Sequence, residues 1–458
     1  MDVQSVISRV VVAAGGRFAP GHLGELTRLV PFEMADAALS ETASVQRRVR
    51  ALPSRVVVYL LLAACLFPEL GYCGVWSKLV AGLAGIPAAV PTAGALAQAR
   101  RRIGPEPLRF LFDLVRGPAA VPRDRAGWWH GLLVCAVDGT ILSVPDTAAN
   151  LARFTKGGSF NGGTGYPQVR LLTLIACGTR TIMDAVFGPT CSGEISYAPA
   201  LVRSLRPGMI VLADRNFAAA SLAAAITRSG AQFLIRARTG RTAPGLPVLR
   251  RCPDGSYLSR FGGVPVRVID VRIAVSTAAG HRESCCRLVT SLTDDRAHPA
   301  GSLAQLYHQR WEIETAYLEL KSTILHGRVL RSKTPAGLDQ EIYALLITYQ
   351  VLRSAIADAA AAVPGTDPDR LSFTIAWQTA RDQLTAAAGV ITADPADLAG
   401  TIGRQALAAL LPSRRLRASP RVVKRAISKY QARGTIDRTS YKAALTINIL
   451  NQPASTDP

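Results

Sequence analysis

The chain has 458 residues, and its 53 Lys and Arg residues exceed its 32 Asp and Glu residues by a formal net charge of +21. Hydrophobic residues make up 49% of the sequence and charged residues 19%, which excludes a disordered chain and allows several packed cores. The longest apolar run, residues 56–67, is shorter than the roughly 20 residues of a membrane span, so we predict a buried helix and no membrane partner. The charge excess therefore favours nucleic acid as the partner.

Residues 1–125 are predicted to form a helical N-terminal DNA-binding domain. One helix ends in three arginines, Arg100, Arg101 and Arg102, and a Gly-Pro turn separates it from the next helix. Two helices joined in this way, with basic residues at the joint, are typical of a DNA-binding unit. The alternative is a solvated helix end whose arginines complement the helix dipole.

From about residue 131 the sequence changes to short runs rich in apolar and β-branched residues. Strands are predicted over 132–137, 169–176, 181–187, 209–213 and 232–236, with helices near 197–205 and over 218–228. Three meandering strands followed by helix, strand, helix and strand are the order of the ribonuclease-H-like fold. Residues 126–237 are therefore predicted to be the first part of such a catalytic domain.

The rest of the chain is predicted to interrupt and then complete that domain. Residues 238–300 are rich in Gly, Pro and Arg and read as a β-rich insertion. A helix over 303–325 belongs to the second part of the catalytic domain, 301–360, and helical segments are expected to continue to about residue 450. The predicted fold class is thus α/β, a ribonuclease-H-like catalytic domain interrupted by a β-rich insertion, with helical N-terminal and C-terminal regions.

The predicted C-terminal region, 361–458, is strongly basic. Between 404 and 442 it carries eleven basic residues and one acidic residue. Arg421, Lys424, Arg425 and Lys429 recur there at helical spacing, which predicts a cationic stripe along a DNA backbone. The alternatives are an ordinary solvated helix and, for the region as a whole, a role in dimerisation.

The helix predicted over 303–325 carries the most informative pattern. On a helical projection Tyr307, Arg310, Glu314 and Lys321 lie within about 60° of one another, beside a separate apolar stripe. A carboxylate flanked by a phenol and two cations suits phosphodiester chemistry. The carboxylate can hold a divalent ion, while the cations bind phosphate oxygens that it would otherwise repel.

Two aspartates at predicted strand ends, Asp138 and Asp214, supply further oxygen ligands. Each alone is more often a turn residue, but strand-Asp, strand-Asp and helix-Glu in this order predict an acidic cluster with Glu314 at one edge of a sheet. Three carboxylates suit two Mg²⁺ ions, for which Mn²⁺ is expected to substitute, in an in-line displacement at phosphorus.

The spacing Tyr307-x2-Arg310-x3-Glu314-x6-Lys321 resembles the Tyr-Arg-Glu-Lys signature of DDE transposases of the insertion-sequence-four family. The 100 residues between Asp214 and Glu314 fit the β-strand insertion that those enzymes carry. Other segments that resemble the family are 137–140, 213–217, 290–292 and 330–334, and the N-terminal region is similar to the family's helical N-terminal domain.

The resemblance implies an enzyme that binds terminal inverted repeats as a homodimer, nicks double-stranded DNA with water and joins the 3′-hydroxyl to a target. The three carboxylates would hold the metal ions, and the other signature residues would grip phosphates near the cleaved end. Some members form a DNA hairpin in which a flipped base stacks on an aromatic residue of the insertion; Tyr257 or Phe261 are the candidates here. The expected location is the cytoplasm, at a bacterial-type nucleoid.

Two other functions remain open on the sequence alone. A DNA-binding derivative of a transposase that no longer catalyses would keep the basic regions, although all three carboxylates are present. A general nuclease on the same fold would cut DNA without preference for particular ends.

Overall fold

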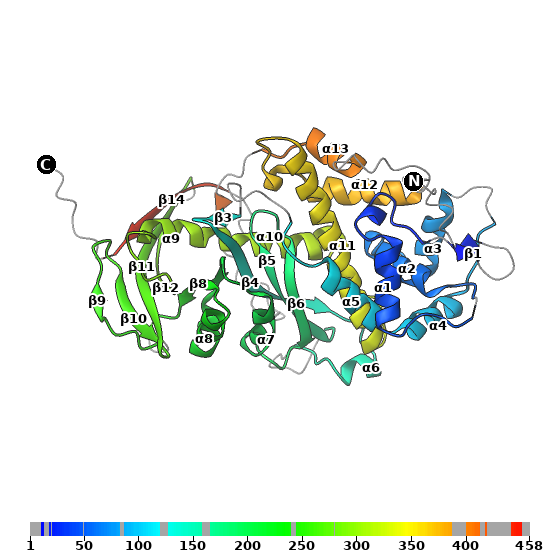
Figure 1. Ribbon diagram of the computed structural model, residues 1–458, viewed down its shortest axis with the longest axis horizontal. Coiled ribbons are helices and arrows are strands. Elements are labelled where there is room, and N and C mark those ends of the chain that lie inside the picture. Colours follow the sequence, from blue (N-terminus) through cyan, green and yellow to red (C-terminus); the bar gives the residue numbers. More distant parts are fainter. Residues whose placement is uncertain are drawn as a thin grey trace, which may run out of the picture.

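A computed structural model describes residues 11–12, 18–19, 21–48, 50–82, 87–119, 127–157, 165–239, 244–278, 280–386, 400–412, 417–418 and 441–450. The molecule is an elongated α/β protein in which a helical body at one end adjoins a long mixed sheet (Figure 1). Within the described ranges, no helix combines the length and apolar character required to cross a bilayer.

The N-terminal part is helical, as predicted. Its elements are β1 (Val11–Val12), β2 (Phe18–Ala19), η2 (Leu26–Arg28), α1 (Phe32–Glu41), α2 (Ser54–Leu66), α3 (Tyr72–Ala81), α4 (Ala93–Ile103) and α5 (Glu106–Val115). Every side chain of α2 from Val56 onward is buried, which confirms the predicted buried helix. Gly104 separates α4 from α5 with a φ of 67°, a left-handed conformation that favours glycine at a helix end.

A mixed sheet forms the centre of the molecule. Its elements in chain order are β3 (Trp128–Trp129), β4 (Leu132–Ser143), α6 (Ala148–Leu151), β5 (Gln168–Ala176), β6 (Ile182–Pro189), α7 (Glu194–Leu201), η3 (Val202–Ser204), β7 (Met209–Ala213), η4 (Arg215–Phe217), α8 (Ala220–Arg228) and β8 (Gln232–Ala237). The strands lie in the order β8-β7-β4-β5-β6. β4 pairs with β7 and β7 with β8 in parallel, whereas β4–β5 and β5–β6 are antiparallel.

β4 is longer than the sequence predicts. The strand does not end at Asp138 but continues to Ser143, because β5 pairs with it along this whole length, up to the pair of Ser143 with Gln168. Its other neighbour, β7, stops earlier, where Ala213 pairs with Val137. Asp138 is therefore the first residue of β4 beyond the end of β7, and the prediction that the strand ends at this position is wrong.

The β-rich segment continues the central sheet. It contains β9 (Arg250–Arg251), β10 (Tyr257–Phe261), β11 (Val264–Thr277) and β12 (Gly280–Thr290), and β12 pairs antiparallel with β8. The chain returns through α9 (Ala300–Tyr307), the 3₁₀ turn η5 (His308–Arg310), α10 (Trp311–Leu318) and the π-helical segment η6 (Glu319–Ile324). The predicted helix over 303–325 is thus one continuous helical path with two irregular segments.

The C-terminal part is helical at first and then adds a strand. Its elements are α11 (Pro335–Ala362), η7 (Pro368–Arg370), α12 (Phe373–Thr385), α13 (Gly400–Ala408), β13 (Arg417–Ala418) and β14 (Tyr441–Ile449). The prediction of helix to about residue 450 is wrong for β14, which pairs with β11. The alternation of Leu445, Ile447 and Ile449 with exposed residues is the period-two pattern of a strand.

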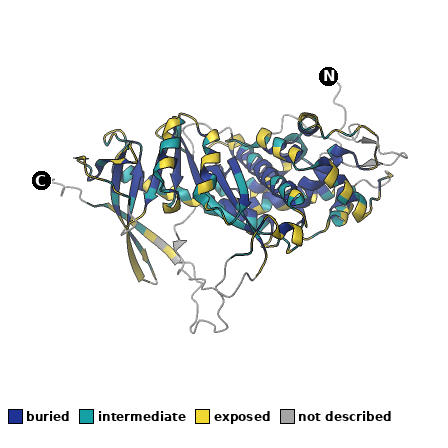
Figure 2. Cartoon of the chain, turned by 90° about the horizontal axis from the view of Figure 1, so that it is seen from below, coloured by how far each residue is buried: buried dark blue, intermediate teal, exposed yellow. Residues whose placement is uncertain are grey.

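Two apolar cores cover the two faces of the sheet. α7 and α8 pack on one face, against side chains such as Cys135 and Val137 of β4. α10 and α11 pack on the other face, against Val134 and Ala136, and this second core is continuous with the N-terminal helices. Buried residues accordingly follow the strands and the inner sides of the helices (Figure 2). The helix with Glu314 is therefore fixed against the sheet at the level of Asp138.

Candidate active site

Asp138 lies at the open place in the sheet that the end of β7 creates. Its carboxylate accepts a hydrogen bond from the N–H of Gly139 at 2.8 Å and pairs with Arg310 at 3.5 Å. Burial is the main cause that raises the pKa of Asp138 to about 6, and the nearby carboxylates of Asp214 and Glu194 add to this rise. The N–H of Gly139 and the guanidinium of Arg310 act in the opposite direction.

Asp214 follows the last residue of β7, as predicted. Its side chain caps the 3₁₀ turn η4 by accepting a hydrogen bond from the N–H of Asn216 at 2.8 Å. Because β7 is the parallel neighbour of β4, this carboxylate and Asp138 are brought to the same edge of the sheet.

The helical path brings all four signature residues to that edge. The hydroxyl of Tyr307 donates to the carbonyl of Ala213 at 3.2 Å, Arg310 donates to Glu314 at 2.8 Å, and Lys321 donates to Thr140 at 3.3 Å. The path is not the regular α-helix of the projection, because η5 is tighter and η6 is wider than an α-helix. The predicted stripe nevertheless follows β7 and β4, the strands that lead to the two aspartates.

A second hydrogen-bonded contact fixes this helix to the strands. The hydroxyl of Tyr317, three residues after Glu314, donates to the carbonyl of Asp138 at 2.6 Å and accepts from the N–H of Thr173 at 3.1 Å. Tyr317 is buried, so this bond lies away from competing water. The backbone of Asp138 and the side chain of Glu314 are thereby held in a fixed relation.

The residues present fit a divalent cation. The three carboxylates offer hard oxygen ligands, which Mg²⁺ and Mn²⁺ prefer. The guanidinium of Arg310 contacts both Asp138 and Glu314, so the structure already has positive charge between these two groups. Among the described residues, a tighter group of potential ligands is formed by Cys252, Asp254 and Asp295, but Asp254 there already accepts from the N–H of Ala300.

Sequence reasoning missed a carboxylate close to Asp138, that of Glu194, whose charge adds to the rise in the pKa of Asp138. A Cβ atom placed on Gly139 would lie 2.5 Å from the Glu194 carboxylate, so this glycine leaves room for it on the α7 face of β4, opposite to the face of the Asp138 side chain. Arg170 of β5 pairs with Glu194 at 3.0 Å. The local sequence around Glu194 carries no sign of this role, because the contact depends on α7 returning across the sheet.

Sequence reasoning also missed a basic cavity beside Asp214. Arg215, Arg236 and Arg238 line this cavity of about 320 Å³ together with Asn216. Burial raises the pKa of Tyr307 to about 12, and Arg310 and Arg236 lower it, so the Tyr307 phenol lies within the field of this cluster. Three guanidiniums next to the acidic edge offer the charged, forked donors that phosphate oxygens accept from.

The two predicted stacking residues are not available to a base. Tyr257 and Phe261 are 5% and 6% exposed and belong to the core under α8. They lie four residues apart on β10, on the same face as buried Ser259, so both side chains point into that core. An exposed aromatic ring is found instead at Trp311, which is 54% exposed and lies against Arg310.

The other residues predicted to contact DNA differ in their exposure and in their partners within the protein. Arg100 lies over the ring of Tyr72 and donates to Ser332, so its guanidinium has partners within the protein. Arg102 is exposed but donates to the carbonyl of Leu52 at 2.9 Å, and Arg101 is exposed; both remain predictions as DNA contacts. The predicted cationic stripe, Arg421, Lys424, Arg425 and Lys429, lies outside the described residues.

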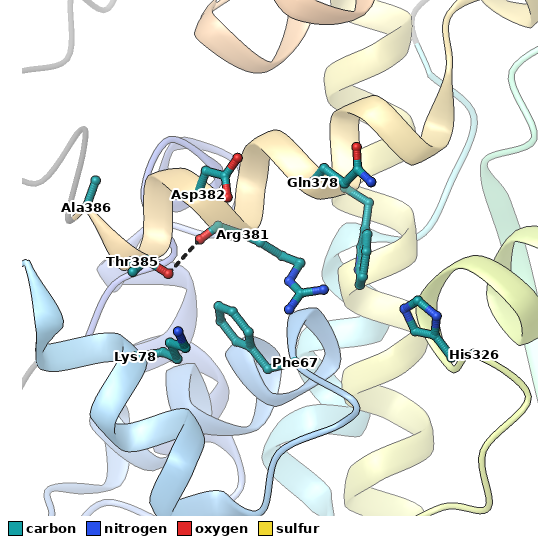
Figure 3. Close-up of a pocket in the computed structure, with 9 residues that line it drawn as sticks. Phe67, Lys78, His326, Gln378, Arg381, Asp382, Thr385 and Ala386 are labelled. Carbon is teal, nitrogen blue, oxygen red and sulfur yellow. Dashed lines mark hydrogen bonds between the residues drawn. The ribbon is translucent and has the colours of Figure 1, made fainter.

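A larger cavity, of about 670 Å³, lies among the helices and is separate from the carboxylates. Figure 3 shows Arg381 reaching between Phe67 and His326, with Lys78 on the opposite wall. The Arg381 guanidinium lies 4.9 Å from the centre of the Phe67 ring and pairs with Glu69. None of the signature residues lines this cavity, so it is not part of the acidic site.

Comparisons with known proteins identify two matching domains and two relatives. Residues 20–113 match the insertion element 4 transposase N-terminal domain, and residues 129–351 match the transposase DDE domain. The chain is 28% identical over 413 residues to the transposase InsG for insertion sequence element IS4 of Escherichia coli (strain K12), covering 87% of this chain and 91% of InsG. It is 29% identical over 140 residues to the putative transposase InsZ of the same organism, covering 30% of this chain and 46% of InsZ.

Among solved structures, a cryo-electron microscopy structure of the piggyBac transposase synaptic complex with hairpin DNA aligns with a TM-score of 0.43 and 10% identity, over 83% of this chain and 80% of that chain. On the two domain matches and the InsG similarity, the protein is a DDE transposase, an enzyme that cleaves DNA with a divalent metal. Within that class, the chain belongs to the insertion-sequence-four family, which confirms the prediction from the Tyr-Arg-Glu-Lys signature.

Proposed function

We propose that this transposase binds the terminal inverted repeats of its own insertion sequence, cleaves a DNA strand at each end and joins the freed 3′-hydroxyl to target DNA. The observation that supports this most directly is the convergence of Asp138, Asp214 and Glu314 at one sheet edge. The strand order β6-β5-β4-β7-β8, with only the last three strands parallel, supports a ribonuclease-H-like catalytic domain.

In this proposal the three carboxylates hold two Mg²⁺ ions, and Mn²⁺ substitutes. Bound ions of this kind activate the attacking oxygen and stabilise the leaving oxygen of an in-line displacement. The guanidinium of Arg310 pairs with two of these carboxylates, those of Asp138 and Glu314. Once the two carboxylates are neutralised by metal ions, Arg310 can bind a phosphate oxygen of the DNA instead.

The remaining signature residues orient the DNA. Tyr307 keeps its proton near neutral pH, since burial raises its pKa to about 12, and it can therefore donate a hydrogen bond to phosphate. Lys321, which bonds Thr140, marks the other end of the stripe. A DNA strand that runs from the cavity of Arg215 and Arg236 past Asp138 toward Lys321 would place its scissile phosphate at the three carboxylates.

The proposed partners follow from the reaction. Two ends must be cut and joined to one target, which favours a homodimer that holds both ends, with the basic segments 404–442 and Arg101 as additional DNA contacts. We expect the protein to act at the bacterial nucleoid, where its ends and targets lie.

The proposal is tested with the matched variants Glu314→Gln and Glu283→Gln. Glu314→Gln keeps the shape of the side chain but removes the charge that binds metal, so we expect no detectable Mg²⁺-dependent nicking and unchanged binding of inverted-repeat DNA. Glu283 is an exposed residue of β12, and its variant should cut normally. Cleavage at the wild-type rate by Glu314→Gln would overturn the proposal.

The same assay separates the alternatives. A protein that binds ends but never nicks them with Mg²⁺ or Mn²⁺ is a silent derivative of a transposase. A protein that cuts unrelated duplexes as fast as the repeat ends is a general nuclease.

The basic cavity gives a further prediction about DNA binding. Arg236→Gln removes one of the three guanidiniums, so it should weaken end binding several-fold and reduce the slope of log K against log salt by about 1. Arg228→Gln at the exposed far end of α8 is the control and should leave the slope unchanged. Equal slopes for Arg236→Gln and the wild type, measured by electrophoretic shift, would exclude Arg236 as a phosphate contact.

A further inference from the structure

The helix with Glu314 has a second set of charged residues on its buried side. Glu312 and Glu319 lie seven residues apart and therefore share one face of the helical path. Each precedes a signature residue by two positions, Glu312 before Glu314 and Glu319 before Lys321. Their side chains are 11% and 10% exposed, whereas the Glu314 side chain is 41% exposed.

A single arginine from the sheet binds both of these carboxylates. Arg180 donates from Nε to Glu312 at 2.6 Å and from one terminal nitrogen to Glu319 at 3.0 Å, and its other terminal nitrogen binds Asp369 of η7. Its side chain is 3% exposed. Burial alone would lower the pKa of Arg180, but Glu319, Glu312 and Asp369 more than reverse this effect and raise it, so the guanidinium stays charged.

The backbone at Arg180 is specialised for this contact. Arg180 ends the tight turn between β5 and β6 and has a φ of 58°, which is a left-handed conformation uncommon for a residue other than glycine. The turn is fixed by the N–H of Arg180, which donates to the carbonyl of Ala176 at 2.9 Å. β5 is also the strand that pairs with Asp138, so Arg180 connects the Asp138 sheet rigidly to the Glu314 helix.

The network continues into α11 and holds the π-helical segment. Arg353, which is 1% exposed, donates to Glu319 from Nε at 3.0 Å, and the hydroxyl of Tyr349 donates to the same carboxylate at 3.0 Å. Two guanidiniums and a phenol thus face three carboxylates, of which those of Glu312 and Glu319 are buried. A helix held at two points seven residues apart cannot rotate about its axis, so Glu314 and Lys321 keep their direction toward the sheet edge.

We infer that Arg180 is a positioning residue of this transposase, which holds Glu314 in place for metal binding without touching metal or DNA. The inference depends on the proposed role of Glu314 as a metal ligand. Partners that orient a metal ligand typically change metal affinity by about 10–100-fold when they are removed. Loss of Arg180 should therefore weaken metal binding at Glu314 while DNA binding stays intact.

Three variants test the inference. Arg180→Lys keeps the charge but lacks the planar fork that reaches three carboxylates. Arg180→Gln alone leaves buried carboxylates uncompensated, so the folded variant for comparison combines it with Glu312→Gln and Asp369→Asn, which leaves Glu319 with Arg353. Arg203→Gln is the matched control, because Arg203 binds Asp184 of the same β5–β6 hairpin with two hydrogen bonds, at 2.8 and 2.9 Å.

Two measurements distinguish a positioning role of Arg180 from a role in stability alone. Below the melting temperature of each variant, we expect Arg180→Lys and the triple variant to need about tenfold more Mg²⁺ for half-maximal nicking. With Fe²⁺ and ascorbate, hydroxyl-radical cutting of the protein backbone should fall at least about threefold near Glu314 relative to the cutting near Asp138. End binding in Ca²⁺ should match the wild type, and Arg203→Gln should keep the wild-type Mg²⁺ requirement and Fe²⁺ cutting pattern even though it loses stability.

A wild-type Mg²⁺ requirement and wild-type Fe²⁺ cutting near Glu314 in the folded Arg180 variants would overturn the inference and assign Arg180 to stability alone. That outcome leaves the proposed function standing if Glu314→Gln is inactive. If Glu314→Gln itself cuts DNA, the proposed function fails, whatever the Arg180 variants do.

Discussion

Asp138→Asn is expected to abolish strand cleavage and, at the same time, to make the protein more stable. The amide keeps the shape of the side chain and can still accept the Gly139 N–H, but it is a poor metal ligand, so cleavage should fall by about 1,000-fold or more. Stability should rise because Asp138 is charged at neutral pH in a place that disfavours its charge. In the metal-free protein, a partly buried carboxylate that is suited to bind metal is charged without a metal ion to neutralise it, and this lowers the free energy of unfolding.

The pH dependence follows from the sign of the shift. The pKa of Asp138 is about 6 in the folded protein, above its ordinary value of 3.8, so the folded state binds more protons than the unfolded state between these two pH values. Its contribution to stability is therefore greatest below pH 4 and is lost as the pH rises through 6, by at most about 3 kcal/mol. In EDTA at pH 7, Asp138→Asn should raise the free energy of unfolding by about 1–2 kcal/mol.

Urea unfolding at pH 4 and at pH 7 measures this effect. The difference between Asp138→Asn and the wild type should be present at pH 7 and nearly vanish at pH 4, where both side chains are neutral. The exposed residue Asp382 of α12 provides the control, since Asp382→Asn changes a carboxylate that lies in water. A variant that loses activity and is also less stable at pH 7 would contradict the assignment of Asp138 as a strained metal ligand.

The sequence was sufficient to predict the acidic site because its residues are marked locally. One helical path carries the four signature residues, Tyr307, Arg310, Glu314 and Lys321. Because their spacing matches the helical period, their side chains point in similar directions, even though η5 and η6 depart from regular α-helical geometry. Asp214 is marked in the same way by the apolar strand before it. Strands β5 to β8 were predicted to within one or two residues for the same reason, since β-branched runs signal strands directly, whereas β4 extends six residues beyond its predicted end.

The sequence failed where a role depends on distant partners. Asp138-Gly139 has the composition of a turn, but pairing with β5 extends the strand through it, and the glycine instead makes space for Glu194. Arg180 lies 132 residues from Glu312, and nothing near it in the chain indicates that partner. β14 was missed because the basic composition before it suggested helix, whereas the neighbour that makes it a strand, β11, lies far away in the sequence.

A similar long-range contact joins the N-terminal helices to the catalytic part. Arg331 lies between α2 and α11, where its terminal nitrogens donate to the carbonyls of Ala64 at 2.6 Å and Leu70 at 3.0 Å. These carbonyls lie at and just beyond the C-terminal end of α2, where helix carbonyls lack partners of their own. Glu341 of α11, which is 4% exposed, accepts from the N–H of Arg331 at 2.9 Å and from its Nε at 3.3 Å.

Arg331→Leu is therefore expected to cause the largest loss of stability among the changes considered, about 3 kcal/mol, because it leaves Glu341 without its cation and the end of α2 without donors. Arg153→Gln is the control, since Arg153 pairs with Asp339 of the same helix at 2.8 Å but is more exposed, and it should cost less than about 1 kcal/mol. Adding Glu341→Gln to Arg331→Leu should recover part of the loss, because it removes the uncompensated charge. A loss equal to that of Arg153→Gln, measured by urea unfolding, would mean that the two parts are held together by apolar packing alone.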